Sequence, residues 1–392
     1  MTTALETTTV AAGVGFDLSA EQELLRGEIR RFAEERIRPG VAERDERREF
    51  PAEVVRELGS MGVLGLFVPE RWGGAGFDMV AYVVAIEELA RVCPATAVTV
   101  SVTNSVCCWP ILTFGSDELR GRVLPELAGG EAIGGFGLTE PGAGSDVAAI
   151  RTTARRDGDE WVLDGEKAWI TNAGLARWFV VVARTGEEGS RGLSAFAVPS
   201  DAPGFSVGTP EHKLGLRASR TAPLYFSGCR IPAGNLLAAE GQGFKVAMAT
   251  LDHSRLGIAA QAVGIHQRAL ELAVSYARER RQFGKPIAEH QAVQLEIAQM
   301  ATELAAARVS TQGAAALADA GSSDAGRLAS QAKLYASEAA NRAAAKSLQL
   351  HGGNGFHEDY EISRLYRDVR VTTIYEGTSE MQRLVIARRL LR

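Results

Sequence analysis

The chain has 392 residues, a formal net charge of -5 and a sequence pI near 5.8. Hydrophobic residues make up 46% and charged residues 23%, which is typical of folded globular proteins and excludes a disordered or fibrous chain. Nucleic-acid-binding proteins usually carry a basic stripe, and this acidic sequence has none, so we expect no nucleic-acid partner. The length predicts two or three domains with room to enclose a large cofactor.

Cysteine and histidine spacing bounds the chemistry further. The four cysteines show no C-x-x-C spacing, which predicts neither a disulfide framework nor a zinc site and suits a reducing cytoplasm. The six histidines lack the paired spacing of metal ligands, so we expect no metal. Residues 1–18 lack the basic start and apolar core of a secretion signal, and we expect them to form a flexible tail.

The first predicted unit, residues 19–131, is an N-terminal α-helical domain, because its apolar residues recur at helical spacing. Within it, residues 92–116 form an uncharged stretch that is long enough to cross a membrane. The stretch also holds Pro94, Asn104 and Pro110, so we predict a buried helix or pocket wall and no membrane span.

The hydrophobic pattern of the sequence then changes twice along the chain. Residues 132–233 contain short apolar runs between turn residues, which predicts a middle β domain with hairpin turns at Asp157 and Asp164. Between Pro232 and Pro286 an apolar period near 3.6 predicts one long helix. The same helical period continues through residues 234–392 and is interrupted by glycine and proline, which favours an antiparallel bundle of long helices.

Three segments carry residues suited to binding and chemistry. Residues 136–146 (Phe-Gly-Leu-Thr-Glu-Pro-Gly-Ala-Gly-Ser-Asp) combine glycine with hydroxyl side chains and suit a flat polar ligand, although a structural turn explains them equally well. Strands follow this segment, so the dinucleotide fingerprint of a Rossmann domain is not met. Residues 169–172 (Trp-Ile-Thr-Asn) offer an indole and a hydroxyl, but alone they favour a core tryptophan. Glu376 stands in a largely uncharged run and alone would be a solvated loop residue.

Together and in this order, the three segments resemble the acyl-CoA dehydrogenases, and the resemblance extends from Phe50 to the C-terminus. It implies a mostly α fold with a β middle domain: an N-terminal helical domain, a central β-barrel-like domain and a C-terminal four-helix bundle. Further matching motifs are Val68-Pro-Glu-Arg-Trp-Gly-Gly, Glu87-Glu-Leu-Ala, Leu251-Asp-His-Ser-Arg, Arg280-Arg-Gln-Phe-Gly-Lys-Pro and Gln349-Leu-His-Gly-Gly.

The resemblance implies FAD-dependent α,β-dehydrogenation of a short- or medium-chain, or short-branched, acyl-CoA to the trans-2-enoyl-CoA. Glu376 would be the base that removes the α proton, while a hydride passes to flavin N5. Some family members carry the base at the position of Ser254, which is not a carboxylate, and this favours Glu376. The implied FAD contacts are Phe136, Leu138, Thr139, Gly144, Ser145, Trp169, Ile170, Thr171, Arg280, Gln282, Phe283, Gln349, Gly352, Gly353, Thr378 and Glu380. The implied substrate contacts are Ser145, Asp252, Ser254, Arg255, Tyr375 and Gly377.

Helix geometry adds an independent argument about assembly. At ~1.5 Å per residue, Arg255 and Arg280 would lie about 38 Å apart on one helix, too far for one site. The far end would then serve a cofactor bound by a neighbouring subunit, which agrees with the homodimer or homotetramer that the resemblance implies. The resemblance also implies an electron-transferring flavoprotein as acceptor. Three alternatives stay open: a dehydrogenase for acyl groups on a carrier protein, a flavin-dependent monooxygenase or oxidase, and a flavin-binding protein without turnover.

Overall fold

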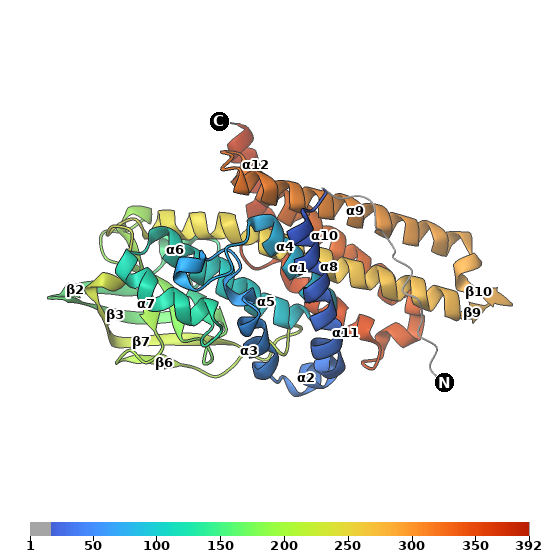
Figure 1. Cartoon of the computed structure of the whole chain (residues 1–392), viewed down its shortest axis with the longest axis horizontal. Helices are drawn as coiled ribbons and strands as arrows, with labels where there is room; N and C mark the ends of the chain where they lie inside the picture. Colours follow the sequence, from blue (N-terminus) through green and yellow to red (C-terminus); the bar gives the residue numbers. More distant parts are fainter. Residues whose placement is uncertain (1–16, 392) are drawn as a thin grey trace.

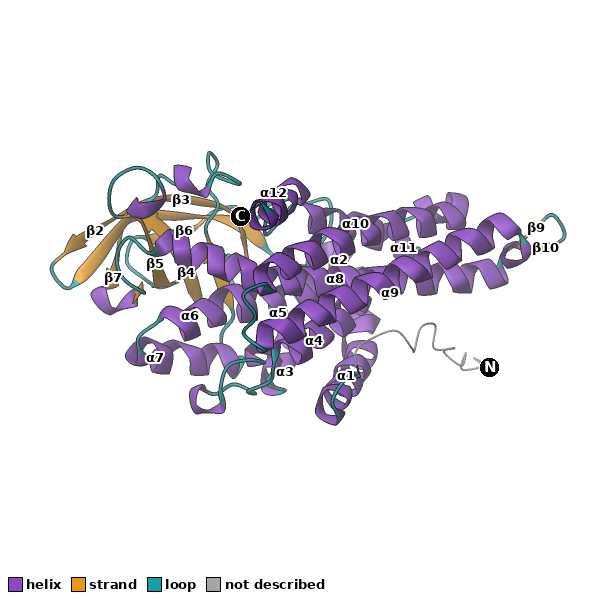
Figure 2. Cartoon of the chain, turned by 90° about the horizontal axis from the view of Figure 1, so that it is seen from above, coloured by secondary structure: helices purple, strands orange, loops and turns teal. Residues whose placement is uncertain are grey.

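The structure is a computed structural model and describes residues 17–391 (Figure 1). Helices come first along the chain, a β-sheet follows, and long helices complete it. Both views place the sheet at one end of an elongated molecule and the long helices toward the other (Figures 1 and 2). The predicted flexible tail, apart from residues 17 and 18, lies outside the described residues.

The N-terminal part is helical, as predicted. Its first helix, α1 (Ala20–Phe32), starts at a capping box in which Ser19 and Gln22 satisfy each other's backbone N–H groups. The helices that follow are α2 (Val41–Arg47), α3 (Ala52–Ser60), α4 (Met79–Val92), α5 (Pro94–Val102), α6 (Trp109–Phe114) and α7 (Asp117–Ala128).

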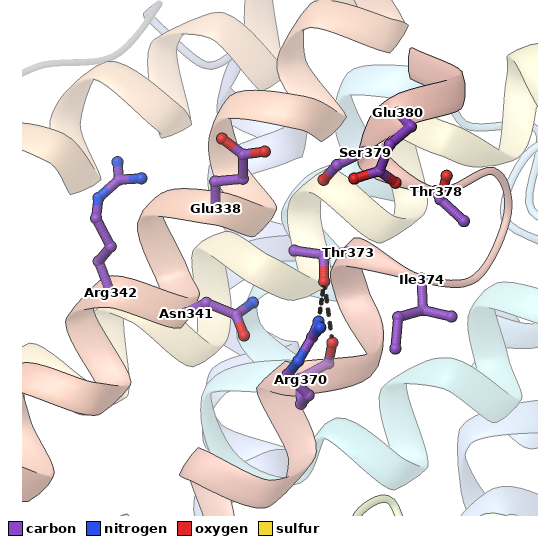
Figure 3. A pocket seen from close by; sticks show the side chains of 9 residues that line it. All are labelled: Glu338, Asn341, Arg342, Arg370, Thr373, Ile374, Thr378, Ser379 and Glu380. Carbon is purple, nitrogen blue, oxygen red and sulfur yellow. Dashed lines mark hydrogen bonds between the residues drawn. The ribbon is translucent and has the colours of Figure 1, made fainter. Parts of the chain in front are cut away.

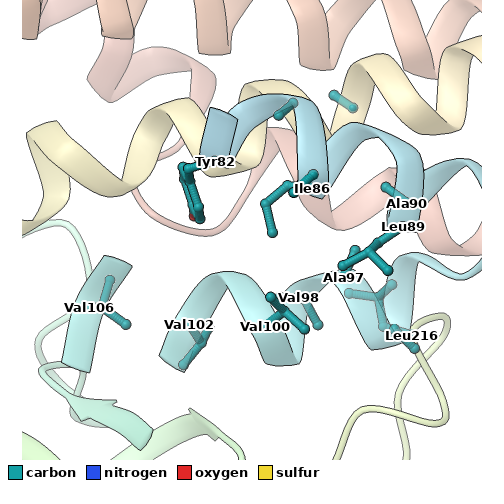
Figure 4. Close-up of a cluster of buried hydrophobic side chains, with 14 of the residues drawn as sticks. Tyr82, Ile86, Leu89, Ala90, Ala97, Val98, Val100, Val102, Val106 and Leu216 are labelled. Carbon is teal, nitrogen blue, oxygen red and sulfur yellow. The ribbon is translucent and has the colours of Figure 1, made fainter. Parts of the chain in front are cut away.

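Residues 94–114 form one continuous helical run, in which a π-helical turn at Thr103–Cys108 joins α5 to α6. By length and composition this run could cross a membrane, but 78% of its apolar window is buried inside the protein. α4 packs along α5 through Ile86, Leu89 and Val98, as Figure 4 shows. The run is therefore a buried helix, in agreement with the sequence-based expectation.

The middle part forms one eight-stranded sheet with the order β6-β7-β3-β2-β4-β5-β8, in which β1 pairs with β4. β4 and β5 are buried along almost their whole length, so they form the centre of this layer. The strands are β1 (Gly134–Gly137), β2 (Thr153–Asp157), β3 (Glu160–Thr171), β4 (Trp178–Arg184), β5 (Leu193–Pro199), β6 (Phe205–Val207), β7 (Thr221–Pro232) and β8 (Leu236–Leu237).

One of the two predicted hairpin turns is wrong. Asp157 and Gly158 do form the turn between β2 and β3. Asp164, in contrast, lies inside β3, where the register with β7 shifts between Leu163 and Gly165. This shift is a β-bulge, and Gly165 adopts a φ of +142° there. An Asp-Gly pair supplies the same backbone freedom to a bulge and to a hairpin turn, so its residue types alone do not separate the two.

The C-terminal part is a bundle of long helices, and the long helix predicted between two prolines is present. The bundle consists of α8 (Gly243–Glu279), α9 (Gln291–Asp319), α10 (Ala325–His351), α11 (Glu361–Val369) and α12 (Ser379–Leu390). A small hairpin, β9 (Arg281–Gln282) and β10 (Lys285–Pro286), joins α8 to α9. Both views show α8 running from the sheet to this hairpin at the distant end of the molecule (Figures 1 and 2).

Candidate active site

Glu376 lies in the turn that leads from α11 into α12. Its backbone has a φ of +51° and that of Gly377 a φ of +93°. A left-handed conformation is strained for a residue with a side chain, and such strain is typical of functional sites. Two side chains hold this turn: Lys333 Nζ donates to the Gly377 carbonyl oxygen at 2.7 Å, and Gln382 Nε2 donates to the same oxygen at 2.9 Å.

The Glu376 side chain is partly buried, and its Oε2 is fully buried without a hydrogen-bond partner among the described residues. Burial raises the pKa of this carboxyl from its ordinary value to about 7. The neighbouring Ser254 hydroxyl and the positive charges of Lys333 and Arg255 act in the opposite direction. A carboxylate with an unpaired oxygen and a near-neutral pKa is suited to general base chemistry.

Neutral hydroxyl groups from the helices around Glu376 complete its surroundings. The Tyr82 hydroxyl of α4 lies 2.8 Å from Ser101 Oγ of α5, and the Tyr375 hydroxyl donates to Gln261 of α8. Burial and the charge of Glu376 both raise the pKa of each tyrosine, so both phenols stay protonated. The part of the site that α4 and α5 form is therefore polar but uncharged.

We call the groups Tyr82, Ser101 and Gln261 the polar wall. One glycine of α8, Gly257, leaves room for the contact between Tyr82 and Ser101. A Cβ on Gly257 would come within 2.2 Å of the Tyr82 hydroxyl and within 2.6 Å of Ser101 Oγ. Any side chain at this position would break the Tyr82–Ser101 contact.

Two of the sequence-predicted segments meet at the edge of the sheet. The Ala168 N–H donates to the Thr139 carbonyl at 2.9 Å, which ties the loop after β1 to β3. Lys167 strengthens this tie: its fully buried ammonium donates to the Leu138 carbonyl at 3.1 Å and to the Glu140 carboxylate at 2.8 Å. The predicted flavin contacts at residues 136–139 and at residues 169–171 are thus neighbours in space.

This edge of the sheet fits a flat aromatic cofactor. Trp169 is 62% exposed although it is large and apolar, and its φ of +63° is left-handed. A Cβ built on Gly142 or Gly144 would meet no atom within 4 Å, so the backbone of this loop is open to a ligand. Exposed Ser145 adds a hydroxyl. The residue set therefore fits the flavin ring of FAD.

A pocket of about 440 Å³ opens beside the N-terminus of α12, between α10 and the turn before α12 (Figure 3). Thr378 caps α12 by accepting a hydrogen bond from the Met381 N–H at 3.3 Å. A helix N-terminus of this kind favours an anionic group such as a phosphate. The pocket is lined by Glu338, Asn341, Arg342, Arg370, Thr373, Ile374, Thr378, Ser379 and Glu380, and so includes two predicted FAD contacts.

The remaining predicted FAD contacts lie elsewhere, at the far end of α8. Phe283 there is 92% exposed and has a φ of +54°. The end of α10 lies beside the end of α8, because Tyr276 stacks on His351 with ring centroids 4.2 Å apart and accepts a hydrogen bond from Asn354. We call the exposed residues at this end the distal group: Arg280, Gln282, Phe283, Gln349, Gly352 and Gly353.

The predicted substrate contacts on α8 take part in internal contacts. Arg255 is 5% exposed and binds Asp252 and Ser330, the latter at 3.0 Å. Asp252 also accepts from Arg389 at 2.8 Å, which ties α8 to α12. Ser254 is buried and faces Glu376.

Four residues around Glu376 were not predicted from the sequence: Lys333, Gln382, Tyr82 and Gln261. One signal was available for Lys333, because it shares its helical face with alanines at positions 329, 336 and 340, where a lone charge is unusual. The other three sit in ordinary helical patterns. Within residues 17–391, no group of three His, Cys, Asp or Glu side chains could hold a metal ion.

Comparison with known proteins agrees with these features. Family models for the N-terminal, middle and C-terminal domains of acyl-CoA dehydrogenases match residues 19–131, 135–229 and 241–391. An acyl-CoA dehydrogenase of Bacillus subtilis is 45% identical over 95% of this chain and 99% of its own length. The mitochondrial short-chain specific acyl-CoA dehydrogenase of Rattus norvegicus is 47% identical over 96% of this chain and 91% of its own length.

Among solved structures, butyryl-CoA dehydrogenase from Megasphaera elsdenii matches with a TM-score of 0.94 at 39% identity, covering 96% of this chain and 100% of that one. The chain therefore belongs to the acyl-CoA dehydrogenase family, whose members are FAD-dependent oxidoreductases. The expected three-domain fold is confirmed.

Proposed function

We propose that this enzyme converts a short- or medium-chain, or short-branched, acyl-CoA to the trans-2-enoyl-CoA, with Glu376 as the base. The observation that carries the proposal is the state of the Glu376 carboxyl. Its pKa is raised to about 7, and one of its oxygens is buried without a partner. A group in this state is half ionised near neutral pH and can both accept and release a proton.

The residues of the chain divide the work of the reaction. Glu376 takes the α proton at its carboxylate oxygen. The hydrogen bonds from Lys333 and Gln382 to the Gly377 carbonyl oxygen hold the turn and so keep the carboxylate in place. FAD, when bound, supplies the acceptor for the hydride from the β carbon. The segments at residues 136–145 and 169–171 would hold its ring, and Thr378 and Glu380 would contact the rest of it. Tyr82, Tyr375 and the buried run at residues 94–114 keep bulk water from the reacting carbons.

The polar wall supports the short end of the proposed substrate range. The Tyr82–Ser101 contact and the Tyr375–Gln261 hydrogen bond place polar groups of α4, α5 and α8 where a long alkyl chain would need space. Buried hydroxyl and amide groups also contact a long apolar chain poorly. The names of two relatives, short-chain specific and butyryl-CoA dehydrogenase, agree with this range.

We further propose that the distal group contacts the FAD of a second subunit, in a homodimer or in the dimers of a homotetramer. The support is its distance along α8 from the residues around Glu376. Electrons would leave the reduced cofactor through an electron-transferring flavoprotein. A reducing cytoplasm suits the four cysteines, all of which are free and buried.

The test is anaerobic mixing of the purified yellow protein with saturated acyl-CoA thioesters of increasing length and branching. We expect loss of the oxidised flavin absorbance with short chains and little loss with long ones, because the proposed wall limits chain length. Glu376→Gln should bind FAD and thioester and lose about 10³-fold or more in rate, because the amide cannot accept the proton. Glu118→Gln removes an exposed carboxylate of α7 and should react normally. Near-normal rates in Glu376→Gln would refute the assignment of the base.

A further inference from the structure

Lys333 is a lysine in an unusual place. It lies on α10 with no exposed surface, and its neighbours along the same helical face are Ala329, Ala336 and Ala340, all buried. Burying an ammonium group is costly unless a counter-charge and hydrogen-bond acceptors lie close by. The reason for this residue must therefore be found in what its ammonium group contacts.

The ammonium group contacts the turn that carries the catalytic base. Lys333 Nζ donates to the Gly377 carbonyl oxygen at 2.7 Å, and Gln382 Nε2 donates to the same oxygen at 2.9 Å and to the Glu376 carbonyl oxygen at 3.3 Å. Gln382, like Lys333, has no exposed surface. Two buried donors thus fix two consecutive left-handed residues, and one of the donors is charged.

The charges that act on Glu376 come from two helices, Lys333 on α10 and Arg255 on α8, and the two residues differ in their other partners. Arg255 of α8 also faces Glu376, but its guanidinium binds Asp252, which in turn binds Arg389 of α12. Tyr82 of α4 and Tyr375 remain neutral.

The other acidic groups that act on Lys333 are compensated or exposed. Glu338, one turn along α10, binds Arg383, and Glu380 is exposed to solvent. The Glu376 carboxylate is the strongest of the negative charges acting on Lys333. Lys333 is therefore a cation whose main counter-charge is the proposed base itself.

We propose that Lys333 is a positioning residue for Glu376, which holds the Glu376–Gly377 turn in its left-handed form and keeps the carboxylate ionised near neutral pH. This inference rests on the proposed role of Glu376 as the base. Its two parts are separable, because the chain provides one charged and one uncharged donor to the same carbonyl oxygen. The lowered pKa of Lys333, about 8, still leaves the ammonium charged at pH 7.

The experiment compares three variants by the pH dependence of kcat/KM and kcat with a short acyl-CoA. Lys333→Met removes both donor and charge, Lys333→Gln keeps a donor but removes the charge, and Gln382→Leu removes a donor without changing charge. We expect both Lys333 variants to shift the acidic limb of the profile upward by about one pH unit, because an adjacent cation favours the carboxylate. Gln382→Leu should lower kcat about tenfold at every pH without moving the limb.

Bound FAD, measured by absorbance, and the thermal midpoint show whether each variant is folded. An acidic limb at the wild-type pH in folded, FAD-loaded Lys333→Met and Lys333→Gln would overturn the inference. So would loss of folding in both Lys333 variants while Gln382→Leu folds normally, since the role would then be structural. Near-normal activity in Glu376→Gln, measured in parallel, would instead refute the base assignment, so the two failures are distinguishable.

Discussion

At the scale of single residues, the raised pKa that suits Glu376 to act as a base also lowers the stability of the protein when the carboxyl is ionised. Its pKa is raised above the ordinary value of 4.5 to about 7, so the folded state binds a proton more tightly than the unfolded chain. The stabilisation from this proton is fully present below pH 4.5 and is lost as the pH rises through about 7. At higher pH the enzyme carries a buried charge that its fold disfavours.

Glu376→Gln should therefore stabilise the protein at pH 8. A pKa shift of this size corresponds to a gain in the free energy of unfolding on the order of 3 kcal/mol, since each pKa unit is worth about 1.4 kcal/mol. At pH 5 the gain should largely disappear, because the wild-type group is then protonated. Urea unfolding at both pH values, with FAD at one fixed concentration, measures the difference. Equal gains at the two pH values would contradict the raised pKa.

The sequence pointed to Glu376 as the candidate base, but not to its backbone conformation or to its unpaired carboxylate oxygen. Its position came from the resemblance of the motif around it, whereas its left-handed backbone and unpaired oxygen depend on contacts from α8 and α10. The same holds for Trp169 and Phe283, whose positive φ values no local pattern predicts. Helices with strong apolar periods, such as α8, were predictable because periodicity is a local property. The bulge at Asp164 was not, because it depends on pairing with β7.

At the scale of elements, a closed ring of ion pairs fastens the N-terminal helices to the bundle. Arg91 of α4 binds Glu34 and Glu271, each at 2.7 Å, and its side chain is only 12% exposed. Ion pairs of this kind are hard to break singly, because a lost partner leaves a charge without compensation. In order around the ring, its members are Arg91, Glu34, Arg38, Glu361, Arg268 and Glu271.

We expect Arg91→Met to destabilise the protein by about 2 kcal/mol, since Glu34 and Glu271 each lose one of their two arginine partners. Arg47→Met is the matched control: it breaks an exposed pair with Glu43 and should cost less than about 0.5 kcal/mol. Chemical unfolding of both variants at neutral pH tests this. A similar cost for the two would mean that the ring adds no more than a surface pair.

The pH dependence of the ring has the opposite sign to that of Glu376. Its arginines lower the pKa of Glu271 and Glu361, and that of Glu34 to about 2. Their stabilisation is present above the ordinary carboxyl pKa near 4.5 and is lost as the pH falls toward 2. Acid unfolding of Arg91→Met should therefore begin at a higher pH than that of the wild type, as circular dichroism during acid titration would show.

At the scale of the whole molecule, one chain holds its proposed FAD contacts in two separate groups. The sheet edge and the α12 pocket form one group, and the distal group lies at the other end of α8 (Figure 2). If each cofactor is shared between subunits, a lesion at the sheet end and a lesion at the distal end damage different sites in a mixed dimer.

This arrangement predicts complementation between two inactive variants. Glu376→Gln and Arg280→Ala, unfolded and refolded together, should recover about a quarter of the wild-type activity, as random pairing leaves one intact site in each hybrid dimer. Each variant refolded alone serves as the control. No recovery, despite hybrid dimers detected by differential tagging and mass spectrometry, would show that every subunit builds its site by itself.

The buried run at residues 94–114 also constrains how the chain can be made. It leaves the ribosome early, but α8, which covers one side of it, begins at Gly243. For the time needed to synthesise the whole sheet, a stretch as apolar as a membrane helix lacks part of its native cover. We therefore expect nascent chains that stop before α8 to bind chaperones through this run, and release to follow once α8 has emerged. The segment proposed to keep water from the reacting carbons is thus also one that can aggregate during synthesis.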